Sequence, residues 1–181
     1  MKFRYLPALL LLCFTACKKE TSQTNMISFD FEGVHHSMPV SQAYLIVMDV
    51  GNNPGKYLYV QTDSSVQPVV SFLIRENTTD HSLSTFATLT YPSMLTAHQC
   101  TDTLSTSACI GFSMAYYDNT NGALGTYLHT DNVSVFNVVN ASGTPPFLTA
   151  TFTCQLVDSA NTISPKAVTN GLIWDAAYAK R

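Results

Sequence analysis

Three cysteines in the second half of the chain carry side chains capable of covalent chemistry. Cys100 and Cys109 bound the polar ten-residue segment CTDTLSTSAC, which is predicted to be a loop. In an oxidising compartment such a loop closes readily, and a disulfide between its ends would contribute about 2–3 kcal/mol in the chain-entropy model. We therefore predict a Cys100–Cys109 disulfide, with a Cys109–Cys154 bridge as the alternative. Cys154 lies in an apolar alternation and is expected to be a small buried core residue.

The adjacent histidines His35 and His36 could in principle bind a metal ion. Neighbouring side chains on a β-strand point to opposite faces, so the two imidazoles cannot readily share one ion. We expect both to be exposed polar residues near a turn. The cysteines lack CxxC spacing, which disfavours zinc. The remaining histidines are isolated in the sequence: His81, His98 and His129. No metal and no other cofactor is predicted.

No segment has the spacing of a catalytic motif. Residues 111–115, GFSMA, lack the final glycine of a Gly-x-Ser-x-Gly nucleophile elbow. Residues 118–122, DNTNG, lack the alternating oxygen ligands of a calcium loop, and an Asn-Gly hairpin turn explains them. Asp30, Glu32 and Asp49 are dispersed and are expected to be solvated charges. The sequence therefore predicts no catalytic residues and no enzymatic activity, although groups distant in sequence can meet in a fold.

Aromatic side chains are the remaining candidates for ligand binding. If several of these side chains share one exposed face, they could stack on sugars or contact a partner protein. The alternative is that they fill the core and the strand ends. The set comprises Tyr57, Tyr59, Tyr91, Tyr116, Tyr117, Tyr127, Trp174 and Tyr178.

The elements that position these side chains are predicted to be strands. Charged residues make up only 12% of the chain, whereas Thr, Ser, Val, Tyr and Phe are plentiful, which favours a pleated and half-buried surface over helices. Residues 26–31 alternate cleanly, with Ile27, Phe29 and Phe31 on one face. Nine to eleven short strands separated by turns are typical of an antiparallel sandwich or barrel, and we expect the β-sandwich. Residues 26–181 are enough for one domain.

The N-terminus has the pattern of an export signal. Lys2 and Arg4 precede the apolar run 5–16, which is too short for a membrane span of roughly 18–20 residues but fits a signal-peptide core. Without residues 1–16, seven Lys and Arg side chains face twelve Asp and Glu, a net charge of −5. An acidic chain without basic clusters disfavours nucleic-acid binding.

The segment Phe14-Thr15-Ala16-Cys17 resembles the lipobox of bacterial lipoproteins. The resemblance implies that the signal, residues 1–16, is cleaved before Cys17, which is acylated, and that residues 17–25 are a lipidated tether. Cys13 is the competing lipidation site, but Leu12 before it is bulky. An ordinary secretory signal with an incidental Cys17 is the alternative.

The mature domain resembles small β-sandwich lipoproteins of Bacteroidetes. The similarity rests on Phe29-Asp30-Phe31-Glu32-Gly33, on the strand 148–154 and on the strand 168–174, which contains Val-Thr-Asn-Gly. It implies the fold and a lipid-anchored envelope location. We expect the outer membrane and leave its periplasmic or surface face open. Asp102-Thr103-Leu104 and Asp158-Ser159-Ala160 also resemble an O-glycosylation signal of Bacteroidetes envelope proteins. The family implies no activity.

These observations together predict a lipid-anchored, non-catalytic binding or interaction module. Its partners would be the membrane, through the N-terminal lipid, and a glycan or protein. The alternatives are a structural component of the envelope, or a hydrolase acting on an envelope polymer. An exposed row of aromatic side chains would favour the binding module. A wholly polar surface would favour the structural component, and a cleft in which histidine and carboxylate side chains converge would favour the hydrolase.

Overall fold

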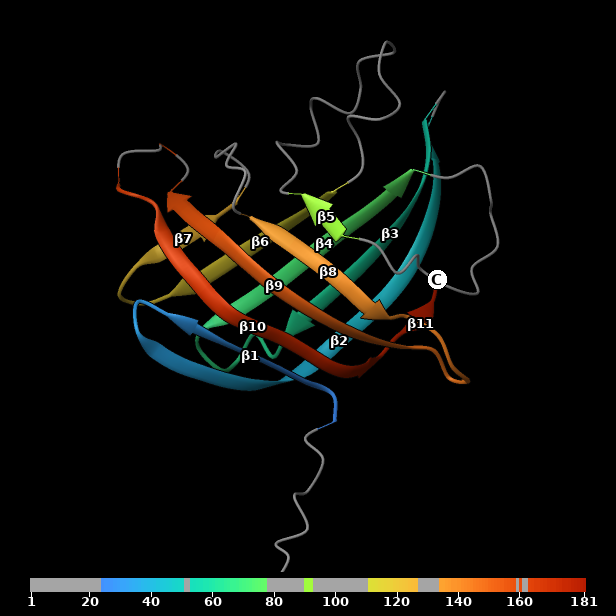
Figure 1. The fold of residues 1–181 in the computed structure, drawn as a ribbon, viewed down its shortest axis with the longest axis horizontal. Helices are drawn as coiled ribbons and strands as arrows, with labels where there is room; N and C mark the ends of the chain where they lie inside the picture. The colour runs from blue at the N-terminus through green and yellow to red at the C-terminus, as the bar shows by residue number, and fades with distance from the viewer. Residues whose placement is uncertain are drawn as a thin grey trace, which may run out of the picture.

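The computed structural model describes residues 24–50, 53–77, 90–92, 111–126, 134–158, 160 and 163–181. Within these ranges the chain is all-β, as predicted (Figure 1). No segment of them forms a helix with the length and hydropathy of a membrane span. The strands are β1 (Met26–Phe31), β2 (Val34–Val50), β3 (Asn53–Thr62), β4 (Val69–Asn77), β5 (Thr90–Pro92), β6 (Gly111–Asp118), β7 (Gly122–Gly125), β8 (Val135–Asn140), β9 (Phe147–Asp158), β10 (Lys166–Ala177) and β11 (Ala179–Lys180).

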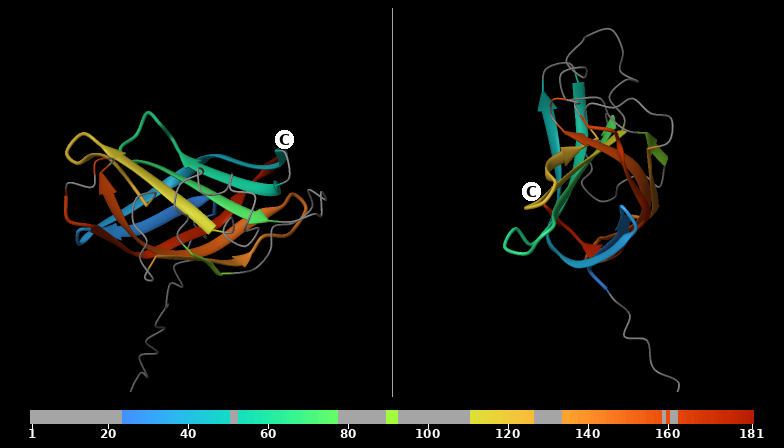
Figure 2. Two further views of the ribbon diagram at one scale, coloured as in Figure 1. Left: turned by 90° about the horizontal axis from the view of Figure 1, so that it is seen from above. Right: turned by 90° about the vertical axis from the view of Figure 1, so that its left-hand side faces the viewer.

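Eight of these strands close into a barrel (Figure 2). Their order is β10-β1-β2-β3-β4-β6-β7-β9, and β9 pairs again with β10, which completes the ring. Every pairing in the ring is antiparallel. The prediction of an antiparallel all-β fold is therefore confirmed, but the prediction of a sandwich is wrong.

Two long strands explain why the sheet closes. The sequence predicts separate strands before and after residues 40–42, but β2 runs unbroken for 17 residues. A register irregularity between Val40 and Gln42 bends β2, so its first part pairs with β1 and its second part with β3. The 12-residue β9 also changes partners, at the opposite corner of the barrel. Its first part pairs with β8 and its last residues pair with β7. A sandwich would have needed chain breaks at these corners.

The barrel thus has two walls. Wall A comprises β5, β8, β9, β10, β1 and β2 up to Pro39, and wall B comprises the rest of β2 with β3, β4, β6 and β7. The short β11 continues the path of β10 and pairs in parallel with β2 of wall B.

Inward-facing aromatic rings fill the space between the walls. Phe72 of β4 lies 4.7 Å from Phe152 of β9 and 5.7 Å from Phe136 of β8, measured between ring centroids. Phe29 and Phe112 are equally buried. The alternation predicted for β1 is confirmed, because Ile27, Phe29 and Phe31 all lie in the core. An eight-stranded barrel is narrow enough for side chains to fill it, and these rings make it a packed core.

Candidate functional site

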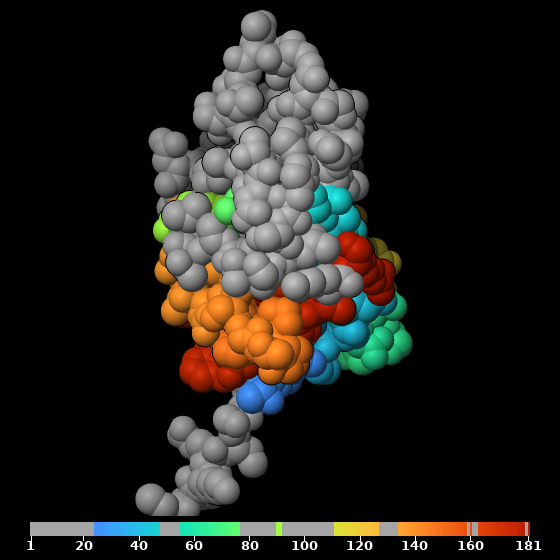
Figure 3. Space-filling model, turned by 90° about the vertical axis from the view of Figure 1, so that its right-hand side faces the viewer, coloured from blue at the N-terminus to red at the C-terminus, as the bar shows by residue number. Residues whose placement is uncertain are grey.

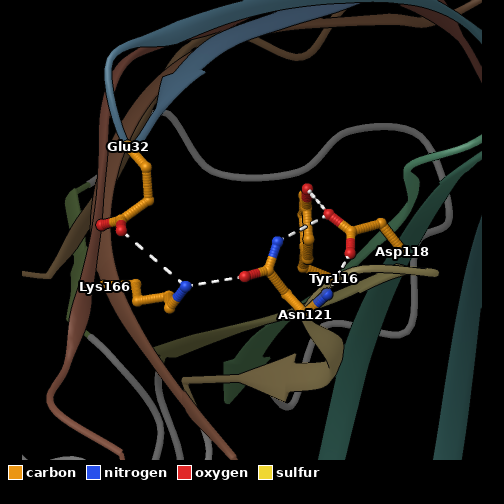
Figure 4. Close-up of polar contacts among 5 residues, drawn as sticks. All are labelled: Glu32, Tyr116, Asp118, Asn121 and Lys166. Carbon is orange, nitrogen blue, oxygen red and sulfur yellow. Dashed lines mark hydrogen bonds and ion pairs between the residues drawn. The ribbon is translucent and has the colours of Figure 1, made fainter.

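One end of the barrel is covered by a polar cluster, the end cap, made of Glu32, Tyr116, Asp118, Asn121 and Lys166 (Figure 4). Strand alternation turns Tyr116 and Asp118 of β6 inward. The Asn-Gly hairpin predicted after Asp118 is confirmed, since β7 begins at Gly122 with φ at 69°. The end cap therefore joins the β6–β7 turn, the start of β10 and the β1–β2 turn.

Asp118 accepts hydrogen bonds from several donors at once. Tyr116 Oη donates over 2.5 Å, Thr120 N over 2.8 Å and Asn121 Nδ2 over 2.9 Å, and Asn121 N donates as well. Burial acts to raise the pKa of Asp118, but these hydrogen bonds outweigh it and hold the pKa at about 2. Burial raises the pKa of Tyr116, and the hydrogen bond to Asp118 and the negative charge of Asp118 raise it further. A carboxylate so fully bonded is a poor general base.

Lys166 links the hairpin to the rest of the end cap. Its Nζ donates to Asn121 Oδ1 over 2.6 Å, lies 3.7 Å from Glu32 Oε2, and lies 5.7 Å from the Phe31 ring centroid. The expectation of a solvated Glu32 fits its half-exposed side chain. Each member of the end cap is bonded to another, so the cluster is suited to closing the barrel end.

The histidine pair divides between the two faces of β2. His35 points outward, and its Nδ1 lies 2.7 Å from Asp30 Oδ1. Asn170 Nδ2 donates to the other Asp30 oxygen over 2.7 Å, and these two bonds lower the pKa of Asp30. His36 faces inward and stacks on Phe29 at 5.2 Å, so the expectation that it is exposed is wrong. Its burial lowers the pKa of His36.

The described residues hold no group of three or more His, Cys, Asp or Glu side chains arranged to bind a metal ion. Cys154 is buried, as predicted, with its Sγ 3.4 Å from Met114 Sδ. Cys17, Cys100 and Cys109 lie outside the described residues, so the lipidation and the disulfide stay predictions. The same holds for the isolated histidines His81, His98 and His129, and for the two glycosylation signals, whose acceptor residues are Thr103 and Ser159.

The predicted aromatic set is distributed over core and surface. Tyr91, Tyr116 and Tyr178 are buried. Tyr57 and Tyr59 are half-buried on the outer face of wall B, where Tyr117 is 46% exposed. Trp174 is 41% exposed on the outer face of wall A. Tyr127 lies outside the described residues.

The outer face of wall A around Trp174 is a broad surface that we call the Trp174 face. A row of polar side chains and one leucine crosses six strands, directly opposite one another in register. A second row holds Trp174, Met26 and Pro39, with the exposed Val139 beyond it. The first row consists of Thr90, Asn137, Thr151, Leu172, Ser28 and Ser37.

An open groove of about 410 Å³ indents the Trp174 face. Its sides include Val135, Thr151, Asn170 and Leu172. Trp174 lies two positions along β10 from Leu172, and no aromatic ring or cation among the described residues packs on its indole.

A second groove, the Arg181 groove, lies where β11 meets β2. Its volume is about 380 Å³. Tyr44 was not among the candidates, because it sits in an apolar run. The length of the turn could have pointed to Tyr44. Only two residues connect β2 and β3, and a hairpin with so short a turn pairs Tyr44 with Tyr59. The lining residues are Ser41, Gln42, Ala43, Tyr44, Ala177, Tyr178, Ala179 and Arg181.

Comparison with known proteins gives no assignment: no family model, no curated protein and no solved structure matches this chain.

Proposed function

We propose that this chain is a lipid-anchored envelope protein whose barrel binds a glycan polymer on the Trp174 face without transforming it. The observation that supports this proposal is the half-exposed indole of Trp174 beside an open groove whose sides carry both apolar and hydrogen-bonding side chains. A large aromatic ring left in water is poorly explained by packing alone, whereas it offers a platform for a ligand.

The chemistry around Trp174 matches a sugar chain. The apolar side of a sugar ring can stack on the indole, while its hydroxyl groups need hydrogen-bonding partners. Thr151, Asn137 and Ser28 offer small hydroxyl and amide groups that both donate and accept. No charged side chain belongs to the row that contains them. Such a surface binds by many weak contacts, which suits a polymer.

The anchoring part of the proposal rests on Cys17 and the lipobox resemblance. Many tethered copies on one membrane would raise the avidity of weak sites for a polymer that several copies can engage. A non-catalytic role is supported by the end cap, where two carboxylates, a tyrosine and a lysine gather. There Asp118 is saturated with donors and Lys166 is bonded to Asn121 and paired with Glu32.

Glycan arrays with the purified protein, followed by titration of hits, test the proposal. Trp174 is the only tryptophan, so its fluorescence reports occupancy of this face directly. We expect Trp174→Ala to weaken binding at least tenfold, a loss of about 1.4 kcal/mol. Tyr117→Ala is the matched control, because Tyr117 is a similarly exposed aromatic on wall B.

Equal loss in the two variants, or binding without a fluorescence change, would contradict the assignment of the face. Failure to bind, combined with turnover of a polymer, would favour the hydrolase. Failure to bind without turnover would favour the structural component.

A further inference from the structure

We infer that the bound polymer carries acidic sugars and that Arg181 recognises one of their carboxylates in the Arg181 groove, an inference that rests on the proposed function. The site is a carboxylate subsite at the corner of the barrel, next to the Trp174 face.

The groove exists because β1 begins late. Met26, the first residue of β1, pairs with Pro39 of β2 and with Trp174 of β10. Beyond these partners β2 and β10 continue with no β1 residue between them. Strand pairing between β2 and the C-terminal segment is formed at β11, where Ala179 pairs with Tyr44. The gap is bounded by small side chains, Ala43, Ala177 and Ala179.

Arg181 is held in place at the edge of this gap. Its backbone N–H donates to Leu45 O over 2.9 Å, which continues the pairing of β11 with β2. Its guanidinium carbon lies 4.3 Å from the Tyr44 ring centroid, and Tyr59 packs on Tyr44 at 5.0 Å. Tyr59 is itself fixed, because its hydroxyl donates to Gln61 Oε1 over 2.6 Å. A backbone bond and a cation–π stack thus fix a flexible side chain before any ligand binds.

The Arg181 guanidinium is not part of the ion pairs at the other end of the barrel, which involve the Asp30 and Glu32 side chains. The groove therefore presents a guanidinium together with neutral polar side chains such as the Gln42 amide. One guanidinium matches one carboxylate in charge, and its planar fork can bind both carboxylate oxygens. The groove is also within the usual size of small-ligand sites, roughly 300–1,000 Å³.

The Arg181 groove is continuous with the Trp174 face. Ala177 follows Trp174 by three residues on β10, a distance of roughly 10 Å along a strand. Ser41 follows Pro39 by two residues on β2. A single extended chain can therefore stack on Trp174 and place an acidic sugar further along the chain against Arg181. Figure 3, which views the end of the barrel at the right of Figure 1, shows the red C-terminal segment against the cyan part of β2.

Binding of a matched pair of ligands tests the inference. The probes are oligogalacturonate and its methyl ester, which has the same shape without the charge. They are titrated into the purified protein and into Arg181→Gln, Arg181→Lys and Trp174→Ala. We expect the wild type to prefer the acid at least tenfold, and Arg181→Gln to lose that preference while keeping its affinity for the ester. Arg181→Lys should retain only part of the preference for the acid, because lysine lacks the planar guanidinium group that can bind both carboxylate oxygens. Unchanged melting temperatures would show that the variants fold.

The outcomes separate this inference from the proposed function. Equal binding of acid and ester, or an acid preference that survives Arg181→Gln, overturns the carboxylate subsite and leaves the glycan-binding face standing. Binding that is insensitive to Trp174→Ala overturns the proposed face. Binding of neither probe overturns the subsite. Inorganic phosphate and acetate are also tested as competitors of the acidic probe. If phosphate displaces the probe at concentrations at which acetate does not, the ligand of the Arg181 groove is a phosphate and the carboxylate assignment is overturned.

Discussion

At the scale of single residues, Gly171 shows why the Val-Thr-Asn-Gly segment of β10 has its sequence. Asn170 adopts a φ of 52°, and the register of β10 against β9 shifts between Val168 and Gly171. Gly171 then faces inward, opposite Phe152. A Cβ at Gly171 would lie 2.4 Å from Phe152 Cδ2 and 2.5 Å from Phe152 O. The missing side chain is therefore what lets the Phe152 ring enter the core.

We predict that Gly171→Ala lowers the free energy of unfolding by about 3 kcal/mol, at the upper end of overpacking effects. The contact with Phe152 O leaves no side-chain rearrangement that could relieve it fully. Gly33→Ala is the control, because its Cβ would meet nothing within 4 Å. Its positive φ alone should account for a loss of about 1 kcal/mol. Urea denaturation of both variants measures the difference, and equal losses would refute the packing argument.

At the scale of elements, the β6–β7 hairpin and the start of β10 are joined by side chains, although β10 pairs with β1 and β9 and not with the hairpin. Asp118 orders the turn through Thr120 and Asn121, and Asn121 in turn holds Lys166. The hairpin was predictable from Asn121-Gly122, but its contact with Lys166, 45 residues away, was not. The charge of Asp118 thus contributes to the packing of two elements.

We predict that Asp118→Asn removes on the order of 1 kcal/mol of stability at neutral pH, because the pKa of Asp118 lies near 2 instead of 3.8 and solvent screening reduces the corresponding free energy. A carboxyl group whose pKa is lower in the folded than in the unfolded state stabilises the fold at pH values above its unfolded-state pKa. This contribution is lost as the pH falls from about 4 to about 2. The difference between wild type and variant should therefore shrink over that window.

Urea denaturation at pH values from 7 to 2.5 checks this prediction. Glu32→Gln is the matched control, since its half-exposed ion pair at 3.7 Å should contribute less than about 0.5 kcal/mol. A stability difference for Asp118→Asn that stays constant across the pH range would exclude the proposed role of its charge.

At the scale of the whole molecule, β1 begins beside the proposed binding surface. Met26 pairs with both Trp174 and Pro39, so the chain enters the barrel beside the Trp174 face. Residues 18–25 can extend at most about 28 Å. If Cys17 carries lipid, the face is held near the membrane surface, where an envelope polymer would be met.

We predict that Cys17→Ala releases the protein from the membrane fraction as soluble protein or uncleaved precursor. Three acyl chains exceed the two signals required for stable anchoring, so their loss should be decisive. Cys13→Ala is the control and should remain in the membrane fraction. Fractionation and mass spectrometry of the mature N-terminus provide the measurement. A mature N-terminus other than acylated Cys17 would contradict the prediction.

Local patterns identified most of the strands but not how they close. Alternation along residues 26–31 and the turns at Gly33 and Asn121-Gly122 depend on near neighbours, and all three are confirmed. The continuity of β2 through Val40 and Gln42 depends on partners on two different strands. Proline and polar residues there look like a loop when the partners are unknown, so the sequence predicts two strands where the structure has one.

The candidate site was less predictable than the fold. Trp174 was identified by its residue type, but its outward orientation depends on the register shift between Val168 and Gly171, which sets the alternation of the residues that follow. Arg181 carries no sequence signal at all, because its position is set by pairing with Leu45, far away along the chain. His36 was misassigned because its stacking on Phe29 comes from the cross-strand pair between β1 and β2.

The closure of β1 against β10 has a consequence for how the protein is made. Asp30 bonds Asn170, 140 residues further along the chain, and the neighbouring register pairs are almost as distant. The first strand therefore has no permanent partner on that side until nearly the whole chain has been synthesised. Such long-range contacts slow folding. If the N-terminal segment directs export as proposed, a barrel that stays open until β10 is available would suit translocation of the unfolded chain, because β1 and β10 would pair only afterwards.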